Sequence, residues 1–244
     1  MCVFSILSFV RKPDEGNRVK KTVSVIALAL LLAGCSGSSK QSRTGSGGWI
    51  TPPSSGISDY SAYPVKGSGV YPATPFDQFI RQASNRYEVD ETLIRAIIEV
   101  ESSYRPDVIS TSNAVGLMQI KASTAGRDAY RVKGRNGEPS TRELLDPQTN
   151  IDIGTTYIRI IRDQHLAGIT DPQTLNYATI VSYVNGAGAL LRTFDNNRAL
   201  AIEKINALSA DEFYEHVQSK HPASQAPRYL WKVKNAYRAL AMAD

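Results

Sequence analysis

A glutamate on the apolar side of a predicted helix is the residue of this sequence best suited to carry out chemistry. Residues 93–102 read LIRAIIEVES, and the leucine and isoleucines have the three- and four-residue spacing of an amphipathic helix. At about 100° per residue, the apolar side centres about 70° from Leu93, and Glu101 falls at about 80°. Arg95 and Glu99 fall on the opposite side, where we expect an exposed i, i+4 ion pair.

The placement of Glu101 has two interpretations. Desolvating a charged carboxylate is costly, so a buried glutamate can instead raise its pKa and stay neutral. A neutral acid of this kind can donate a proton in catalysis. In the other interpretation the helix ends at Glu101 and the side chain bends into solvent, because Ser102, Ser103 and Pro106 mark a helix end within a turn. The pattern alone leaves both open.

The elements that must position Glu101 are predicted to be helices of one globular domain, residues 76–244. This length is enough for a single hydrophobic core. Strand signals are weak, and Asn136-Gly137 could at most turn a small hairpin, so the fold class is mainly α. Helices are expected over the periodic segments 76–87, 93–98, 151–161 and 177–184, after the N-cap Asp90, after the capping box 209–212, and over 226–242.

Composition narrows the class of protein. Two cysteines rule out a disulfide scaffold or a multi-cysteine zinc site. The three histidines include His216 and His221, which do not share a helical face, and we expect no metal and no cofactor. Residues 35–244 hold 23 basic and 21 acidic residues, which argues against a nucleic-acid partner because such proteins normally carry a basic excess.

Residues 1–34 have the pattern of a secretion signal. Lys20 and Lys21 precede an apolar run, 23–32, of about ten residues, whereas a membrane-spanning helix needs roughly 20. The run ends in LAGC, which resembles the bacterial lipobox, so we expect cleavage before Cys35 and acylation of its thiol. The alternative is an uncleaved signal anchor with an incidental cysteine. Because residues 1–18 fit a leader poorly, we hypothesise that translation starts at Val19.

A flexible tether, residues 35–75, is predicted between the lipid anchor and the domain. Gly, Ser and Pro make up 22 of the 40 residues from Ser36 to Pro75. Its aromatic residues, Tyr71 among them, could dock onto the domain or the membrane surface, but we expect them to be solvated. Ser36 after the cysteine, in place of aspartate, predicts sorting to the outer membrane, with the domain facing the periplasm.

Three motifs around the predicted helices resemble the lytic transglycosylase family. They are Glu101-Ser102, then GLMQ at 116–119, then SYVNG at 182–186. More narrowly, the stretch 97–191 resembles the membrane-bound endo-type members, and the similarity extends through 221–229. Val184 departs from the many relatives in which the motif tyrosine and asparagine are adjacent, and the tether is longer than expected of the endo type.

The resemblance implies a lysozyme-like α fold and an enzyme that acts on the glycan strands of peptidoglycan. It would cleave the β-1,4 bond between N-acetylmuramic acid and N-acetylglucosamine without water. The muramyl 6-hydroxyl would attack C1 to give a 1,6-anhydro end. Glu101 alone would act first as acid and then as base. The chain is expected to act as a monomer.

The resemblance also assigns substrate-binding roles. Ser110 and Ser112 match serines that hydrogen-bond the muramyl N-acetyl group and the catalytic glutamate, and Tyr229 matches a tyrosine whose hydroxyl approaches that glutamate. Taken alone, Met118 and Tyr229 would be core residues, and Asn185-Gly186 a helix end. The implied substrate-binding residues are Ser110, Ser112, Met118, Gln119, Tyr183, Asn185 and Tyr229.

Two alternative functions stay open. The first is a hydrolytic muramidase on the same fold, which would usually need a second carboxylate. Residues 115–123 contain no acid, and the nearest ones, Asp107 and Asp128, have ordinary surface explanations. The second is a peptidoglycan-binding lipoprotein without activity. Retention of Glu101 argues against it, because a binder does not need an acid on an apolar helix face.

Overall fold

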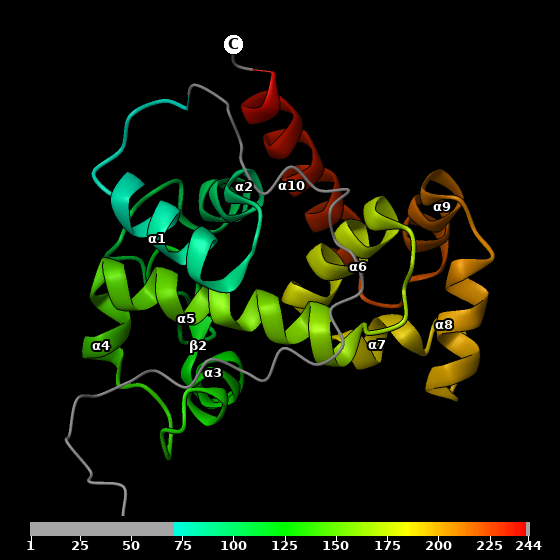
Figure 1. Ribbon diagram of the computed structural model, residues 1–244, viewed down its shortest axis with the longest axis horizontal. Coiled ribbons are helices and arrows are strands. Elements are labelled where there is room, and N and C mark those ends of the chain that lie inside the picture. Colours follow the sequence, from blue (N-terminus) through cyan, green and yellow to red (C-terminus); the bar gives the residue numbers. More distant parts are fainter. Residues whose placement is uncertain (1–70, 243–244) are drawn as a thin grey trace, which may run out of the picture. The chain divides into compact units, whose positions relative to one another are not determined.

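The computed structural model describes residues 71–242 of the chain (Figure 1). The predicted leader 1–34, the start at Val19, Cys35 and the tether as far as residue 70 lie outside the described residues. The elements are α1 (Asp77–Tyr87), α2 (Glu91–Ser102), β1 (Ala114–Val115), β2 (Ile120–Lys121), the π-helical turn η1 (Ala122–Gly126), α3 (Arg127–Val132), α4 (Thr141–Leu145), α5 (Pro147–Ile160), the π-helical turn η2 (Ile161–His165), α6 (Pro172–Asn185), α7 (Ala187–Leu191), α8 (Arg198–Asn206), α9 (Ala210–Lys220) and α10 (Gln225–Ala241).

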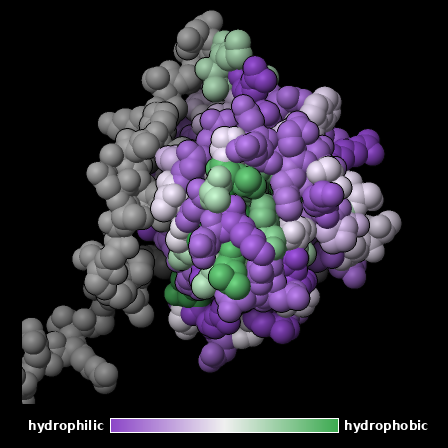
Figure 2. Space-filling view, turned by 90° about the vertical axis from the view of Figure 1, so that its right-hand side faces the viewer, coloured by the Kyte–Doolittle hydropathy of each residue, from purple (hydrophilic) through white to green (hydrophobic). Residues whose placement is uncertain are grey.

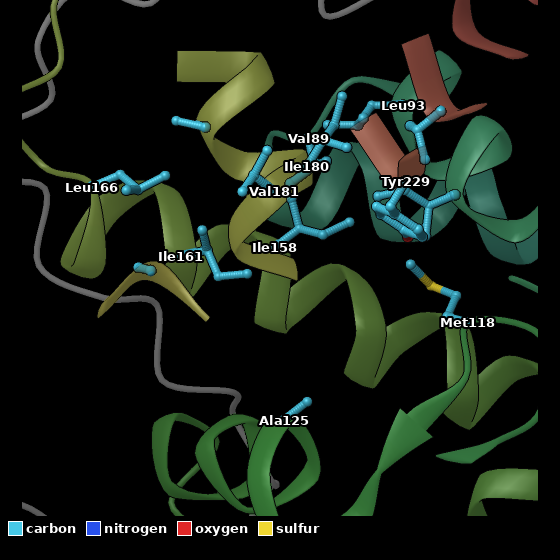
Figure 3. Packing of buried hydrophobic residues seen from close by; sticks show 14 of the residues in the cluster. Val89, Leu93, Met118, Ala125, Ile158, Ile161, Leu166, Ile180, Val181 and Tyr229 are labelled. Carbon is cyan, nitrogen blue, oxygen red and sulfur yellow. The ribbon is translucent and has the colours of Figure 1, made fainter. Parts of the chain in front are cut away.

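The helix α2 lies at the centre of the packing. It is buried continuously from Glu91 to Ile98. It packs against α1 on one side and α10 on another, while α10 also packs against α6, and α5 packs against α1 and α3 (Figure 1). Side chains from these elements form one apolar cluster, part of which is drawn in Figure 3. The catalytic candidate at the end of α2 is therefore held by a helix that is itself fixed on several sides.

The predicted helix starts at Asp90 and Ser209 are confirmed. The Asp90 carboxylate accepts a hydrogen bond from the Thr92 N–H at 2.9 Å. Ser209 and Glu212 form the capping box, in which each side chain bonds the other residue's backbone N–H. These side chains satisfy N–H groups that a helix start leaves without partners. The mainly α character of the domain follows from such local signals.

The small hairpin does not lie at Asn136-Gly137, which is a loop. Within the described residues the sheet is the antiparallel pair β1–β2, with Ala114 opposite Lys121. Its turn, 116–119, has no Asn-Gly or Asp-Gly signal. It is made by two residues in the left-handed region, Gly116 (φ +76°) and Gln119 (φ +47°). The conventional turn signal predicted the wrong place because distant side chains hold this turn.

The expected exposed pair of Arg95 and Glu99 is wrong. Arg95 is only 2% exposed. Its guanidinium forms ion pairs with Glu91 at 2.6 Å and with Asp77 at 2.9 Å, and it lies 4.3 Å from the centre of the Tyr71 ring. The side of α2 opposite the core is covered by α1 and by the segment before it, so the helix is buried on both sides as far as Ile98, while Glu99 is exposed.

Tyr71 is docked on the domain, contrary to the expectation that it is solvated. Its hydroxyl shares a hydrogen bond of 2.7 Å with Thr92 Oγ1, and its ring covers Arg95. Thr74 then bonds the Asp77 carboxylate through both its hydroxyl (2.6 Å) and its N–H (3.1 Å). The ordered chain therefore reaches α2 before the first helix begins.

The face that carries α8 and α9 is mainly hydrophilic, with a narrow band of apolar side chains (Figure 2). Large exposed apolar residues are scattered over the described surface, among them Ile109, Leu200 and Trp231. Single exposed apolar residues are normal on a folded domain. Among residues 71–242, no helix has the length and apolar character needed to cross a bilayer.

Candidate active site

Glu101 lies in the last turn of α2 and is largely buried. Its Oε1 accepts a hydrogen bond of 2.7 Å from the hydroxyl of Tyr229, which comes from α10. The helix ends one residue later, at Ser102. The helix end near Glu101 was expected, but the side chain stays packed against α10 and does not bend fully into solvent.

The pKa of Glu101 is raised from its ordinary value of 4.5 to about 7. Burial is the main cause because it penalises the charged carboxylate. The Tyr229 hydrogen bond and the positive charge of Lys232 act in the opposite direction, since both favour the carboxylate. At neutral pH the group is therefore balanced between its acid and base forms, which is the condition for efficient proton transfer in both directions.

Two tyrosines near Glu101 remain protonated. Burial and the Glu101 charge raise the pKa of Tyr229 and of Tyr183 well above the ordinary value. Tyr229 is consequently a fixed hydrogen-bond donor to the acid. Tyr183, on α6, donates a hydrogen bond of 2.7 Å to the Met118 carbonyl, and its ring lies 5.7 Å from that of Tyr157 on α5. The structure thus brings Tyr183 and Tyr229 together around Glu101.

The chain leaves α2 through a strained turn. Ser103 (φ +50°) and Tyr104 (φ +58°) are consecutive non-glycine residues in the left-handed region, where side chains rarely lie. Ser102 anchors the turn, because its hydroxyl hydrogen-bonds the Leu117 carbonyl at 2.8 Å and lies 3.2 Å from the Ile98 carbonyl. The hydroxyl next to the acid therefore ties the end of α2 to the hairpin.

Gln119 and Met118 occupy the hairpin turn. The Gln119 amide donates hydrogen bonds to the carbonyls of Val108 (3.1 Å) and Gly116 (3.0 Å), so it holds the turn against the preceding loop. Met118 is fully buried, and its side chain points toward Tyr229 (Figure 3). Its side chain packs in the core, and its carbonyl oxygen accepts the hydrogen bond from the Tyr183 hydroxyl.

Asn150, which sequence reasoning did not select, is the main support of this turn. Its buried side chain accepts a hydrogen bond from the Met118 N–H at 2.8 Å and donates to the carbonyls of Val115 (2.8 Å) and Leu144 (2.7 Å). A Cβ at Gly116 would overlap this amide. Asn150 directly precedes the periodic segment 151–161 and follows polar residues, so the sequence offered no clear signal for its burial.

Ser110 and Ser112 form a local turn with each other. Their hydroxyls are 3.1 Å apart, and Ser110 Oγ also accepts the Ala114 N–H at 3.0 Å. In the part of the chain that is described, the only hydrogen bond to the Glu101 carboxyl comes from Tyr229, so the implied serine–glutamate bond is not formed. Both hydroxyls are on the loop between α2 and the hairpin.

Asn185 has an unpaired acceptor at the end of α6. Its Oδ1 is buried and has no hydrogen-bond partner within residues 71–242. The helix ends at the next residue, Gly186, whose φ of +78° suits a glycine. An unsatisfied buried carbonyl oxygen costs free energy, so it is typical of a group that receives a donor from a ligand or from water.

Other chemistry has little support in the described residues. No group of three or more His, Cys, Asp or Glu side chains there could hold a metal. A cavity of about 250 Å³ lies between α1, α3 and α5 and contains none of the residues named above. Its Arg86 and Lys133 both form ion pairs with Asp152, at 2.9 and 2.6 Å. This cavity is thus bordered by a charge network that links the three helices.

Comparison with known proteins identifies the class to which this fold and acid belong. The family of the transglycosylase SLT domain matches residues 78–206, and the chain belongs to this family. The match includes Glu101 and Asn185 but ends before α10, which supplies Tyr229 and Lys232.

Individual relatives narrow the comparison. The chain is 51% identical over 213 residues to the endo-type membrane-bound lytic murein transglycosylase A of Citrobacter koseri, covering 87% of this chain and 96% of the relative. It is 58% identical over 159 residues to the protein of the same name from Cronobacter sakazakii, covering 65% of this chain and 78% of the relative.

Solved structures confirm the expected lysozyme-like α fold. The 70 kDa soluble lytic transglycosylase of Escherichia coli superposes with a TM-score of 0.52 at 27% identity over 68% of this chain. The lytic transglycosylase Slt of Pseudomonas aeruginosa gives a TM-score of 0.52 at 21% identity, which supports the fold alone. This chain spans about a quarter of either solved chain, 24% in both cases.

Proposed function

We propose that the protein is a lytic murein transglycosylase that cleaves within the glycan strands of peptidoglycan. The bond broken is the β-1,4 linkage from C1 of N-acetylmuramic acid to O4 of N-acetylglucosamine, without addition of water. The observation that carries this proposal is the largely buried carboxyl of Glu101, with a pKa of about 7 and a tyrosine hydroxyl on one oxygen. Family membership and the relatives' names support the substrate.

The reaction needs one group that gives and then takes a proton. Protonated Glu101 donates its proton to the glycosidic oxygen as the C1–O4 bond breaks, and the leaving sugar departs with a 4-hydroxyl. The resulting carboxylate then accepts the proton of the muramyl 6-hydroxyl as O6 bonds to C1. The acid is restored, and the product ends in 1,6-anhydromuramic acid. Tyr229 stabilises the carboxylate between the two steps because its hydrogen bond favours the charged form.

The remaining site residues that have a free or exposed polar group are proposed to bind the sugars. The free Oδ1 of Asn185 can accept a hydroxyl or amide proton of the glycan, and the exposed edge of the Ser110–Ser112 turn can meet the N-acetyl group. Gln119 holds the turn through its amide nitrogen, which leaves its oxygen as an acceptor. Met118 and Tyr183 act by positioning, since the first is buried and the second is bonded to the first's carbonyl.

Digestion of purified peptidoglycan tests the proposal. The purified chain and its Glu101→Gln variant are incubated with peptidoglycan, and the masses of the soluble fragments are measured by mass spectrometry. We expect 1,6-anhydromuramic ends from the wild type and none from the variant. Fragments heavier by one water, with reducing ends, would show a muramidase. Fragments from neither protein, while a known muramidase digests the same sample, would favour a binding function.

We propose further that Cys35 anchors the protein to the outer membrane by acyl chains, with the domain in the periplasm and monomeric. The residues before and after Cys35 and the relatives' membrane-bound names support this. Metabolic labelling with palmitate and membrane fractionation test it. Labelling that Cys35→Ala does not remove would refute the anchor, and recovery of the wild type in the inner membrane would refute the sorting. Light scattering measures the molar mass in solution, and a mass of two or more chains would refute the monomer.

A further inference from the structure

Two basic side chains lie beside the acid on the last helix. α10 contains Arg228, Lys232, Lys234 and Arg238 and no Asp or Glu. We define Arg228 and Lys232, which are four residues apart, as the basic edge of α10. Both side chains are exposed. One turn of helix separates them, so they stand together on one side of α10.

The basic edge is close to the reacting carboxyl. Tyr229 fixes the orientation of α10, because its hydroxyl lies 2.7 Å from Glu101 Oε1. At about 100° per residue, Lys232 is about 60° around the helix from Tyr229, and Arg228 about 100° in the same direction. The Lys232 charge acts on Glu101, which confirms that the two groups are near each other. Arg238 lies about 180° from Tyr229 and so points elsewhere.

Neither cation of the basic edge has a partner among residues 71–242: no hydrogen bond or ion pair involves Arg228 or Lys232. Lys234, on the same helix, lies over the rings of Tyr177 (5.2 Å) and Tyr214 (4.1 Å). Lys232 also opposes the raised pKa of Glu101 and so disfavours the acid that starts the reaction. Exposed cations without a partner this near the reacting carboxyl are able to neutralise a negative charge that the substrate brings.

We propose that Arg228 and Lys232 bind a carboxylate carried by a muramyl unit of the substrate. This inference rests on the proposed function and names the chemistry by which that site selects its substrate. Every muramyl unit carries a lactyl group on O3. That group ends in a free carboxylate when the peptide is absent and bears a peptide with its own carboxylates when the peptide is present. Both sources offer the same anion to a guanidinium and an ammonium.

The test compares three glycan substrates of one origin. The first keeps its peptides, the second has been stripped by an amidase and exposes lactyl carboxylates, and the third is the stripped strand after its carboxylates are converted to neutral amides. The enzymes are the wild type, the double variant Arg228→Gln with Lys232→Gln, and the matched control Arg238→Gln. All changes are on exposed positions of one helix, and equal melting temperatures confirm that the variants fold.

We expect the double variant to raise KM about tenfold on a carboxylate-bearing strand and to leave KM on the amidated strand unchanged, while kcat, which Lys232 affects through the pKa of Glu101, stays within about threefold on every strand. A KM rise confined to the peptide-bearing strand assigns the stem peptide, and a rise confined to the stripped strand assigns the lactyl carboxylate. An equal rise on the amidated strand, no rise at all, or the same rise in Arg238→Gln would overturn the inference.

Failure of the proposed function is recognised separately. If the wild type forms no 1,6-anhydro ends on any strand, that proposal is refuted. Equilibrium binding of the same three strands to the wild type and the double variant then decides the inference on its own. The inference is supported if the wild type binds the carboxylate-bearing strands more tightly than the amidated strand and the double variant loses this difference. It is overturned if the wild type binds all three strands equally well.

Discussion

Arg95 and Glu101 lie on one helix, six residues apart, and both are ionisable groups largely removed from water. Arg95 is surrounded by opposite charge from Glu91 and Asp77 and by the Tyr71 ring. Glu101 receives a neutral phenol and forms no ion pair within the described residues. The opposite charges around Arg95 stabilise its charged guanidinium. Among residues 71–242, Glu101 has no such opposite charge in contact with it, and its carboxyl changes charge near neutral pH. In this helix the ion-paired Arg95 serves the structure, whereas Glu101, at the helix end, is available for chemistry.

The largest expected effect is on the compensated end of the helix. Arg95→Met leaves Glu91 and Asp77 without their cation, and we expect the free energy of unfolding to fall by about 3–5 kcal/mol. Urea denaturation at pH 7 measures this. Arg81→Met, at an exposed position of α1, is the control and should stay within about 0.5 kcal/mol. A similar small change for Arg95→Met would break the comparison.

At the other end, removing the charge should stabilise the protein, depending on pH. Below about pH 4.5, Glu101 is protonated in both folded and unfolded chains. As the pH rises from about 4.5 to about 7, the unfolded chain is ionised while the folded one still holds its proton, so stability is lost over this range and stays lower above it. Glu101→Gln cannot ionise, and we expect it to be more stable by up to about 3 kcal/mol at pH 8 and unchanged at pH 4. Denaturation at the two pH values measures the difference, and equal stability at pH 8 would contradict the raised pKa.

Tyr229→Phe sharpens the comparison by removing the single donor to Glu101. Since that hydrogen bond lowers the pKa of Glu101, its loss moves the falling limb of kcat/KM from about pH 7 to higher pH. We also expect kcat to drop roughly tenfold or more, because the carboxylate formed after the first step loses a charge-assisted bond. Rates across pH 5–9 measure both effects. If the falling limb of kcat/KM stays at the same pH in Tyr229→Phe, Tyr229 does not change the pKa of Glu101.

The smallest effect is expected where the chain enters the domain. Tyr71→Ala removes the ring over Arg95 and the bond to Thr92, and we expect a loss of about 1–2 kcal/mol without a change in the pH profile. Tyr71→Phe keeps the ring and separates the two contributions. Thermal melts compare the variants. A profile shift in Tyr71→Ala would mean that the two ends of α2 are coupled.

Helical periodicity placed Glu101 on the apolar side of its helix, because that face is set by the spacing of its own apolar neighbours, but it left open whether the side chain bends into solvent at the helix end. The same helical periodicity placed Arg95 in solvent, because the spacing of residues within one helix carries no information about Tyr71 and Asp77, which lie 24 and 18 residues earlier. The hairpin was misplaced for a related reason: Asn150, about 30 residues downstream, holds its turn. Cleaner signals such as the caps at Asp90 and Ser209 were read correctly because their partners lie within three residues.

The bond between Tyr229 and Glu101 joins residues 128 positions apart. A chain is made from its N-terminus, so α2 exists long before the helix that completes its acid. Until α10 docks, the Glu101 carboxyl lacks one wall of its burial and the hydrogen bond from Tyr229. The acid is therefore assembled by the packing of two helices far apart in the sequence, and it is a property of the folded domain that no local segment carries by itself.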